Sequence, residues 1–375
     1  MRLPPVAPRL RALAATAAAV AAVALPAAAG AMPSSFLGSR HAVSFLASAV
    51  PGAGPAAGDQ NPYGVAVVPR TVGNLVRGDV LVSNFNNAGN QQGTGSSIVE
   101  ISPAGHQRVF AVVRRPTRTP AVGLTTALVA LNNGDVVVGS LPAPGGRSAA
   151  MTAGALSVIN PRGQVVATVT GPDIQGPWDM TAVQGRGQTT LFVTNVLNGT
   201  VAARGRIVRR GTVVRIRLRF AGARPVGVVS RVIAGGFAEH TDPNALVVGP
   251  TGLGMGRRGV LYVADSVGNR IAAVPDALTR STEMGRAGMT VAVGGALRDP
   301  LGLAIAPNGN ILSTNGGNGA IVETRPGGGT AAVRTLVRNG AGDLFGIAVA
   351  PGGSGLYFVD DAGSGMGANS LGLLR

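Results

Sequence analysis

Acidic and amide side chains recur at one place in this chain, directly after short apolar segments. Asp265, Asn315 and Asp360 each close such a segment. A ring of carboxylate and amide oxygens suits Ca²⁺ or another divalent cation, and equally a cationic or polyhydroxylated ligand. The alternative is that each side chain only caps its own turn. Further polar residues lie just before the later repeats of this pattern: His240, Asp242, Asp299 and Asp343.

Trp178 is the single tryptophan, and it is followed by Asp179. An aromatic ring beside a carboxylate can form a platform for a sugar or a cation. It can equally be a packing plug in the core. The sequence leaves both interpretations open.

Arginines alternate with apolar residues in the segment 215–220, which places Arg215, Arg217 and Arg219 on one face of a strand. No acidic residue occurs between Asp179 and Glu239. An exposed face of this kind would contact a polyanion such as an acidic envelope polymer. The alternative is a solvated strand edge that deters pairing with other strands.

Familiar catalytic motifs are missing from the sequence. There is no cysteine, no Gly-x-Ser-x-Gly, no His-Glu-x-x-His and no phosphate-binding loop, and only His41, His106 and His240 are present. No nucleophile–base–acid set is visible, so a binding module is favoured over an enzyme. Residues assembled from different repeats would escape this search.

Six repeats must position these residues. Each begins with a Gly- or Pro-marked motif, for example Asn-Pro-Tyr-Gly at 61–64 and Gly-Pro-Thr-Gly at 249–252, and continues into an apolar strand. A period of about 40 to 60 residues with several short strands is typical of a propeller. The apolar strands lack alternation, which indicates burial on both faces. We therefore predict an all-β, six-bladed β-propeller.

Closure of the ring is predicted from the two ends of the chain. The sixth repeat stops after the segment 370–374 and lacks a fourth strand, while the segment 42–47 is a strand without a repeat of its own. Pairing these two segments would complete the last blade and cover two open sheet edges.

The first 31 residues resemble an export signal, with Arg2, Arg9 and Arg11 before an apolar stretch and Ala29-Gly30-Ala31 as a cleavage site. We predict a signal peptide at 1–31, a single propeller domain at 32–375, and a periplasmic or extracellular location. No later segment is long and apolar enough to suggest a transmembrane helix.

The charge of the chain is strongly positive and unevenly distributed. Removing the three signal arginines lowers the net charge from +16 to +13, and residues 32–238 carry 19 arginines against 6 acids. Such asymmetry is compatible with a polyanionic partner or with charge that serves solubility. Aromatic residues make up only 3% of the chain, which argues against nucleic-acid binding by base stacking.

The segment 261–271, Leu-Tyr-Val-Ala-Asp-Ser-Val-Gly-Asn-Arg-Ile, resembles the NHL repeat. The resemblance implies a six-bladed propeller of the shape shared by regucalcin- and gluconolactonase-like hydrolases, streptogramin lyase and the peptidyl-amidating lyase. A lactonase of this kind carries metal-binding Glu, Asn and Asp in the motifs that begin its repeats. Here those motifs have Gln60-Asn61-Pro62, Pro250-Thr251-Gly252 and Pro300-Leu301-Gly302, so the expected ligands are absent.

These observations predict an exported NHL-like propeller that acts as a binding or interaction module for an unknown ligand or envelope protein. A divalent-metal-dependent hydrolase or lyase, with its site at the mouth of the channel, is the alternative. No cofactor is established, and the metal candidates are Asp265, Asp299, Asp343 and Asp360. The predicted channel-mouth residues are Trp178, Asp179, His240, Asp242, Asp265, Asp299, Asn315, Asp343 and Asp360.

Overall fold

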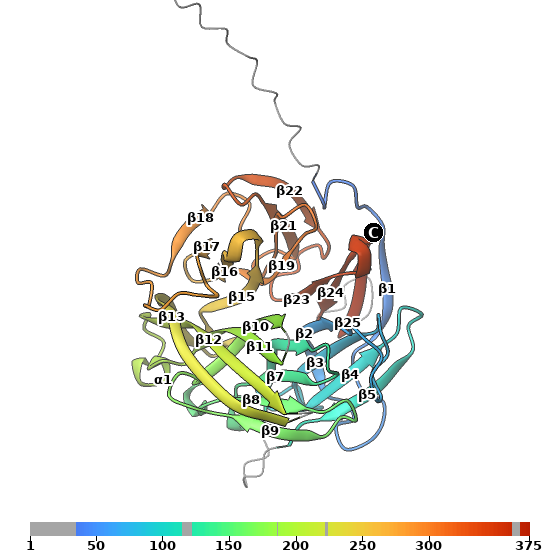
Figure 1. Cartoon of the computed structure of the whole chain (residues 1–375). Helices are drawn as coiled ribbons and strands as arrows, with labels where there is room; N and C mark the ends of the chain where they lie inside the picture. The colour runs from blue at the N-terminus through green and yellow to red at the C-terminus, as the bar shows by residue number, and fades with distance from the viewer. Residues whose placement is uncertain (1–34, 115–121, 186, 222–223, 362–367) are drawn as a thin grey trace, which may run out of the picture. The chain divides into compact units, whose positions relative to one another are not determined.

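The computed structural model describes residues 35–114, 122–185, 187–221, 224–361 and 368–375. These residues form six antiparallel sheets. Figure 1 shows the sheets arranged around a common centre. The predicted all-β, six-bladed propeller is confirmed. The predicted signal peptide and its cleavage site before Met32 lie outside the described residues.

The blades follow one another along the chain, and the strands of each blade pair in sequence order except where the two chain ends meet. Blade 1 contains β2 (Gln60–Val67), β3 (Val80–Asn86), β4 (Ser97–Ile101) and β5 (Gln107–Val112). Blade 2 contains β6 (Leu124–Ala130), β7 (Val136–Ser140), β8 (Ala155–Ile159) and β9 (Val165–Val169). Blade 3 contains β10 (Gly176–Gly185), β11 (Gln188–Val196), β12 (Val208–Ala221), β13 (Arg224–Asp242) and the short β14 (Leu246–Val248).

The second half of the ring is more regular. Blade 4 contains β15 (Pro250–Met255), β16 (Leu261–Asp265), β17 (Arg270–Val274) and β18 (Met289–Val293). Blade 5 contains β19 (Pro300–Ile305), β20 (Ile311–Asn315), β21 (Ala320–Thr324) and β22 (Thr330–Thr335). Blade 6 contains β23 (Leu344–Val349), β24 (Leu356–Asp360), β25 (Ser370–Leu374) and β1 (Val43–Ser48). The one α-helix among the described residues, α1 (Thr200–Ala203), follows β11, and none of their helices is long and apolar enough to cross a membrane.

The ring is closed by the chain ends, as predicted. β1 pairs antiparallel with β25, with Val43 opposite Leu374 and Ser48 opposite Ser370. The first strands of the blades contact one another in the order β2, β6, β10, β15, β19, β23 and back to β2. These six strands therefore line the central channel, and every blade has a neighbour on both sides.

Burial between blades explains the apolar second strands. β3, β7, β16, β20 and β24 are buried at every position. Their side chains fill clusters that span adjacent blades, such as Leu191 and Val193 of β11 with Val137 of β7. A strand covered on both faces has no reason to alternate apolar and polar residues.

The segment that precedes β1 is held by one buried carboxylate. Glu323 of β21 accepts hydrogen bonds from the backbone N–H groups of Phe36 and Leu37, at 2.9 and 2.8 Å, and from the Ser35 hydroxyl at 2.6 Å. Asn308 and Asn310 also donate to it, at 2.9 and 2.6 Å. Phe36 and Leu37 are buried beside blades 5 and 6.

Candidate functional site

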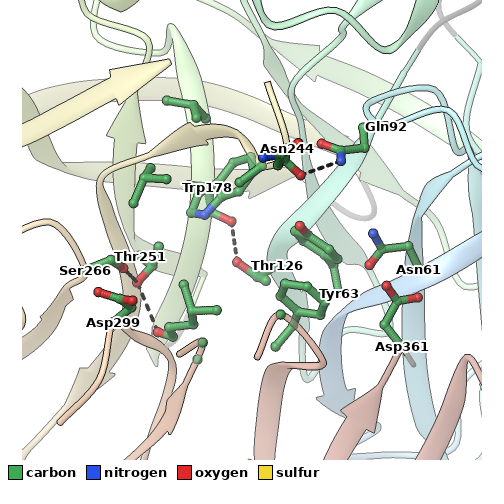
Figure 2. A pocket seen from close by; sticks show the side chains of 18 residues that line it. Asn61, Tyr63, Gln92, Thr126, Trp178, Asn244, Thr251, Ser266, Asp299 and Asp361 are labelled. Atoms are coloured by element: carbon green, nitrogen blue, oxygen red, sulfur yellow. Dashed lines mark hydrogen bonds between the residues drawn. The ribbon is translucent and has the colours of Figure 1, made fainter. Parts of the chain in front are cut away.

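A cavity of about 300 Å³ lies at the mouth of the channel where the first strands of the blades begin (Figure 2). Its walls come from the first strands and from the loops that share this face. The lining residues are Asn61, Tyr63, Gln92, Thr126, Trp178, Asn244, Ala245, Val247, Val248, Thr251, Ser266, Asp299, Leu301, Gly302, Gly316, Gly342, Phe345 and Asp361. We call this cavity the mouth pocket.

One wall of the mouth pocket is aromatic. Tyr63 stacks on Phe345 with ring centroids 4.1 Å apart, and on Phe85 at 4.6 Å. The Trp178 indole meets Tyr63 and Phe85 edge-on, at 5.9 and 5.7 Å. Tyr63, Phe85 and Trp178 are buried, which fixes the rings in place. Phe345 and Phe85 stack on Tyr63, so this wall offers mainly ring edges and apolar surface to a bound group.

The opposite wall is lined by hydroxyl groups. The Thr251 hydroxyl lies 3.1 Å from the Ser266 hydroxyl and within hydrogen-bonding distance of the Ala264 and Pro300 carbonyls, at 3.2 and 3.1 Å. Asp299 lies beside this pair in Figure 2 and is exposed, with a φ of 51°. This positive φ tilts Asp299 out of the strand path just before β19, a conformation that Asp tolerates better than most residues.

A carboxylate and an amide lie at the third side. Figure 2 shows Asp361 beside Asn61. Burial raises the pKa of Asp361 to about 6, and the charges of Asp343 and Asp360 add to the shift. Within the described part of the chain, the Asn61 side-chain oxygen is buried without a hydrogen-bond partner. At pH 7.5 Asp361 is therefore mostly ionised. Because its pKa is close to neutral pH, mild acid would protonate it.

The pocket is partly covered from above by the turn between β13 and β14. The Asn244 carbonyl accepts a hydrogen bond of 2.6 Å from the Gln92 side chain, which links this turn to a loop of blade 1. Ala245, Val247 and Val248 add an apolar surface next to Trp178. The turn after the long β13 thus forms part of the cover of the pocket.

Asp179 lies below the mouth pocket, in a narrow part of the channel lined also by Thr126 and Leu303. It accepts hydrogen bonds from the backbone N–H groups of Met180, at 2.7 Å, and of Leu253 in the next blade, at 3.0 Å. Burial raises the pKa of Asp179 to about 8. Its carboxyl is mostly protonated at neutral pH, so the channel below the pocket carries little charge.

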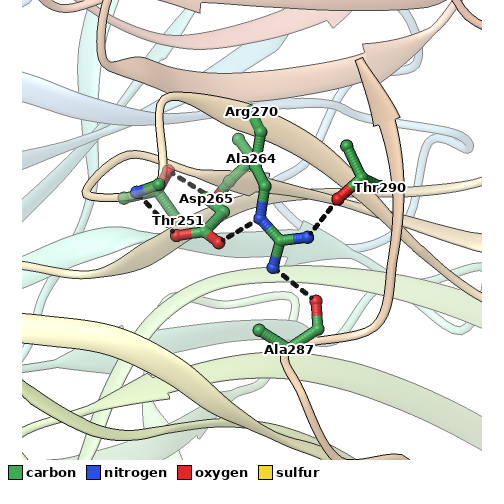
Figure 3. A network of polar contacts seen from close by, with 7 residues as sticks. Thr251, Ala264, Asp265, Arg270, Ala287 and Thr290 are labelled. Atoms are coloured by element: carbon green, nitrogen blue, oxygen red, sulfur yellow. Dashed lines mark hydrogen bonds and ion pairs between the residues drawn. The ribbon is translucent and has the colours of Figure 1, made fainter. Parts of the chain in front are cut away.

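Asp265 is engaged in the structure of its own blade (Figure 3). Its carboxylate pairs with Arg270 at 2.7 Å and accepts the Gly268 N–H at 3.1 Å, so it caps the turn as its motif suggested. Arg270 is further bound to Thr290 and to the Ala287 carbonyl. With its charge paired, Asp265 is a poor ligand for a cation.

The remaining predicted residues divide between the pocket and its supports. Trp178 and Asp299 line the pocket, whereas Asn315 is buried and holds Arg298 and Ala296 in the preceding loop. Asp242 accepts the Asn244 N–H, and the His240 ring lies 3.1 Å from the Thr241 carbonyl. The charges of Asp343 and Asp360 help to raise the pKa of Asp361, and the Asp343 carbonyl also accepts a hydrogen bond of 2.9 Å from the Asp361 backbone N–H.

The four metal candidates, Asp265, Asp299, Asp343 and Asp360, do not form one site. Across residues 35–361 and 368–375, apart from the short gaps, no three His, Cys, Asp or Glu side chains converge as metal ligands require. The proposed divalent-ion set therefore does not fit this geometry.

The arginine face is smaller than the sequence indicated. Arg215 is buried, with 5% of its surface exposed, and donates to the Ala277 carbonyl of blade 4 at 2.9 Å. Burial lowers its pKa, as do the neighbouring charges of Arg217 and Arg231. The expectation that Arg215 is available to a polyanion was wrong. Arg217 and Arg219 are exposed.

Several pocket residues were missed from the sequence. Tyr63, Thr251, Leu301 and Phe345 occupy the same position as Trp178, one residue before the Gly or Asp of the motif that begins each blade. Superposing the repeats would have shown that this position faces the channel. Asp361 directly follows Asp360 at the end of an apolar strand, and its position in the sequence predicted that it lies on this face. Asn61 had no such signal, because its neighbourhood with Asp361 arises from two different blades.

No family model matches the sequence, and no curated protein matches it either. Solved structures show similarity to the whole propeller. A gluconolactonase from Xanthomonas campestris has a TM-score of 0.54 at 13% identity, covering 90% of each chain. A calcium-binding protein, regucalcin, from Agrobacterium tumefaciens has 0.53 at 14%, covering 88% of this chain and 94% of its own.

A streptogramin B lyase has a TM-score of 0.50 at 15% identity, covering 90% of this chain and 98% of the lyase. At these identities the similarity establishes the fold and leaves the activity open. The propeller shape that the NHL-like motif implied is shared with these proteins.

Proposed function

We propose that this chain is an exported binding protein whose mouth pocket takes a small organic cation with an apolar part. The observation that carries the proposal is the combination of a stacked aromatic wall with Asp299 and Asp361 in one 300 Å³ cavity. A cavity of this size holds a small molecule. Aromatic rings together with carboxylates are the recurrent means by which proteins bind alkylammonium groups.

The overall charge of the chain supports the choice of a cation. The protein is basic, with 19 arginines and 6 acids in residues 32–238, yet the described residues that line the pocket include two aspartates and no arginine or lysine. The net positive charge of the protein repels cations, so a locally acidic mouth is a favourable place for one to bind. Burial raises the pKa of Asp179 below the pocket, which disfavours a second negative charge there.

The single tryptophan provides the test, because Trp178 lines the pocket. Intrinsic fluorescence would be titrated with benzyltrimethylammonium and with neopentylbenzene, its neutral carbon isostere. We expect saturable binding of the cation and at least about tenfold weaker binding of the isostere. Asp361→Asn should weaken binding of the cation about tenfold, whereas Asp276→Asn, an exposed residue on an outer turn, is the matched control.

The acid dependence gives a second measurement. With a pKa of about 6, Asp361 loses its charge as the pH falls from 7.5 to 5, so the affinity for the cation should fall with it and the Asp361→Asn variant should not respond. Equal binding of cation and isostere, or an unchanged Asp361→Asn variant, would refute the proposal. Export itself is tested by N-terminal sequencing of secreted protein, with Met32 as the expected first residue.

The second candidate is a divalent-metal-dependent hydrolase or lyase at the same mouth. One observation supports it: the propeller is similar in fold to a gluconolactonase and to a streptogramin B lyase. Elemental analysis of the purified protein tests it. A tightly held divalent ion at a 1:1 ratio, lost in an Asp343→Ala/Asp361→Ala variant, would favour the enzyme over the cation-binding protein.

A further inference from the structure

The outer edge of β13 is only partly covered. In the middle of the strand, at residues 233–235, this edge hydrogen bonds with Met284 and Ala287 of blade 4, and residues 240–242 pair with β14. Over residues 225–232 β13 pairs with β12 on its inner edge alone, and no described residue hydrogen bonds with the backbone of its outer edge. Figure 1 shows β12 and β13 as the longest strands of the propeller. We call residues 225–232 the free edge.

The free edge is apolar as well as unpaired. Val226, Val228 and Val229 have 64%, 44% and 60% of their surfaces exposed. Other outer strands of the propeller expose one or two large apolar side chains each, such as Val333 on β22. An exposed, flat and apolar strand edge is a template for pairing with another strand.

The two faces of the β12–β13 hairpin differ in charge. Arg217 lies opposite Val229 and Arg215 opposite Arg231, so these residues share one face. Arg217 and Arg231 each donate one hydrogen bond to a carbonyl of the turn after β17, at 3.1 and 2.6 Å, which leaves other guanidinium N–H groups free. The second face carries Leu218 and Val228.

The second face also meets an acid. The Ser230 hydroxyl donates to Asp173 at 2.8 Å, and Asp173 belongs to the loop between blades 2 and 3. A strand added at the free edge would place successive side chains alternately on the two faces. Acidic side chains would suit the arginine face, and apolar side chains would suit the face of Val228.

Charge selects the partner. Residues 180–238 contain ten arginines and no acidic residue. Two copies of this hairpin would repel each other, whereas an acidic segment would be attracted. An anionic polymer without a peptide backbone would satisfy the arginines but not the unpaired edge or the valines.

We propose that the free edge of β13 binds an extended acidic segment of another protein, in which acidic and apolar residues alternate, by adding it as a strand to blade 3. The backbone of the segment forms the hydrogen bonds with β13, and the alternation of acidic and apolar side chains provides the specificity. This site is remote in structure from the mouth pocket and does not depend on its ligand.

The test uses fluorescence anisotropy with a labelled acetyl-(Glu-Val)₄-amide peptide. We expect saturable binding that weakens with salt, and at least about tenfold weaker binding of the same peptide with every backbone nitrogen methylated. A Val226→Ser/Val228→Ser variant should bind the peptide about tenfold more weakly, while Met289→Ser/Val293→Ser, which removes equally exposed side chains from β18, should bind it normally. Thermal melting establishes that each variant is folded.

Three results would overturn the proposal. The methylated peptide could bind as tightly as the parent peptide, which would leave only charge attraction. Polyphosphate could compete equally well while the Val226→Ser/Val228→Ser variant retains peptide affinity, which would make the surface a contact for anionic polymers. Sedimentation could show a dimer of this chain that the same variant dissociates, which would assign the edge to a second copy.

Discussion

Replacement of Asp179 by asparagine is expected to stabilise the protein at pH 7 and to destabilise it at pH 4. The folded carboxyl has a pKa of about 8, against about 3.9 in the unfolded chain. Because the pKa is higher in the folded protein, the contribution of Asp179 to stability is fully present below its unfolded pKa and is lost as the pH rises towards and through its folded pKa. At pH 7 the folded protein therefore forgoes about 4 kcal/mol, since each unit of pKa corresponds to about 1.36 kcal/mol.

Asparagine carries no such cost, but it cannot accept all the hydrogen bonds that Asp179 accepts. The donors are the N–H groups of Met180 and Leu253, and the asparagine NH₂ group would face one of them. Leaving one buried donor unpaired costs about 1–3 kcal/mol. The Asp179→Asn variant should therefore be about 2 kcal/mol more stable than the wild type at pH 7, and less stable at pH 4.

Urea denaturation at both pH values measures the difference, with Asp299→Asn on the exposed rim as the control. The control should change stability by less than about 0.5 kcal/mol at either pH. If Asp179→Asn is destabilising by the same amount at pH 4 and pH 7, the carboxyl is ionised in the folded protein. Its hydrogen bonds would then outweigh its burial, and the channel below the pocket would carry a negative charge.

Three further perturbations test the supports of the site. Glu323→Gln should destabilise the protein by about 3 kcal/mol at pH 7, because Gln presents an NH₂ group to donors such as the Leu37 N–H. The pKa of Glu323 is lowered in the folded wild type, so the difference in stability between wild type and variant should shrink as the pH falls below about 4. Arg270→Met should cost about 3–5 kcal/mol in urea denaturation by leaving the Asp265 carboxylate buried and unpaired, and adding Asp265→Asn should recover part of the loss. Deletion of residues 32–48 removes β1 and should give a protein that aggregates or melts at much lower temperature, whereas the separately added peptide 35–48 should restore part of the stability.

The architecture was readable from the sequence because a propeller repeats its local chemistry. The motif around Leu261–Asp265 and its weaker copies recur at a spacing that is typical of a propeller or another array of repeats. An unmatched strand at one end and a missing strand at the other predicted the pairing of β1 with β25, which the register confirms. Burial on both faces likewise follows from the unbroken apolar second strands.

The site could be predicted only in part from the sequence, because contacts between different blades determine which residues line it. Asp265 and Asn315 have the residue types of ligands, yet tertiary contacts bind them to Arg270 and to the preceding loop. Tyr63 and Phe345 are far apart in sequence, and only the closed ring stacks them at 4.1 Å.

What the sequence determined by itself is the number of blades, the closure of the ring and a part of the pocket lining, namely Trp178 and Asp299. The tertiary structure determined which of the candidate side chains are exposed and available to a ligand. Arg215 illustrates the physical reason: alternation along a strand fixes the face on which a side chain lies, but the neighbouring blade determines whether that face is buried or exposed to solvent.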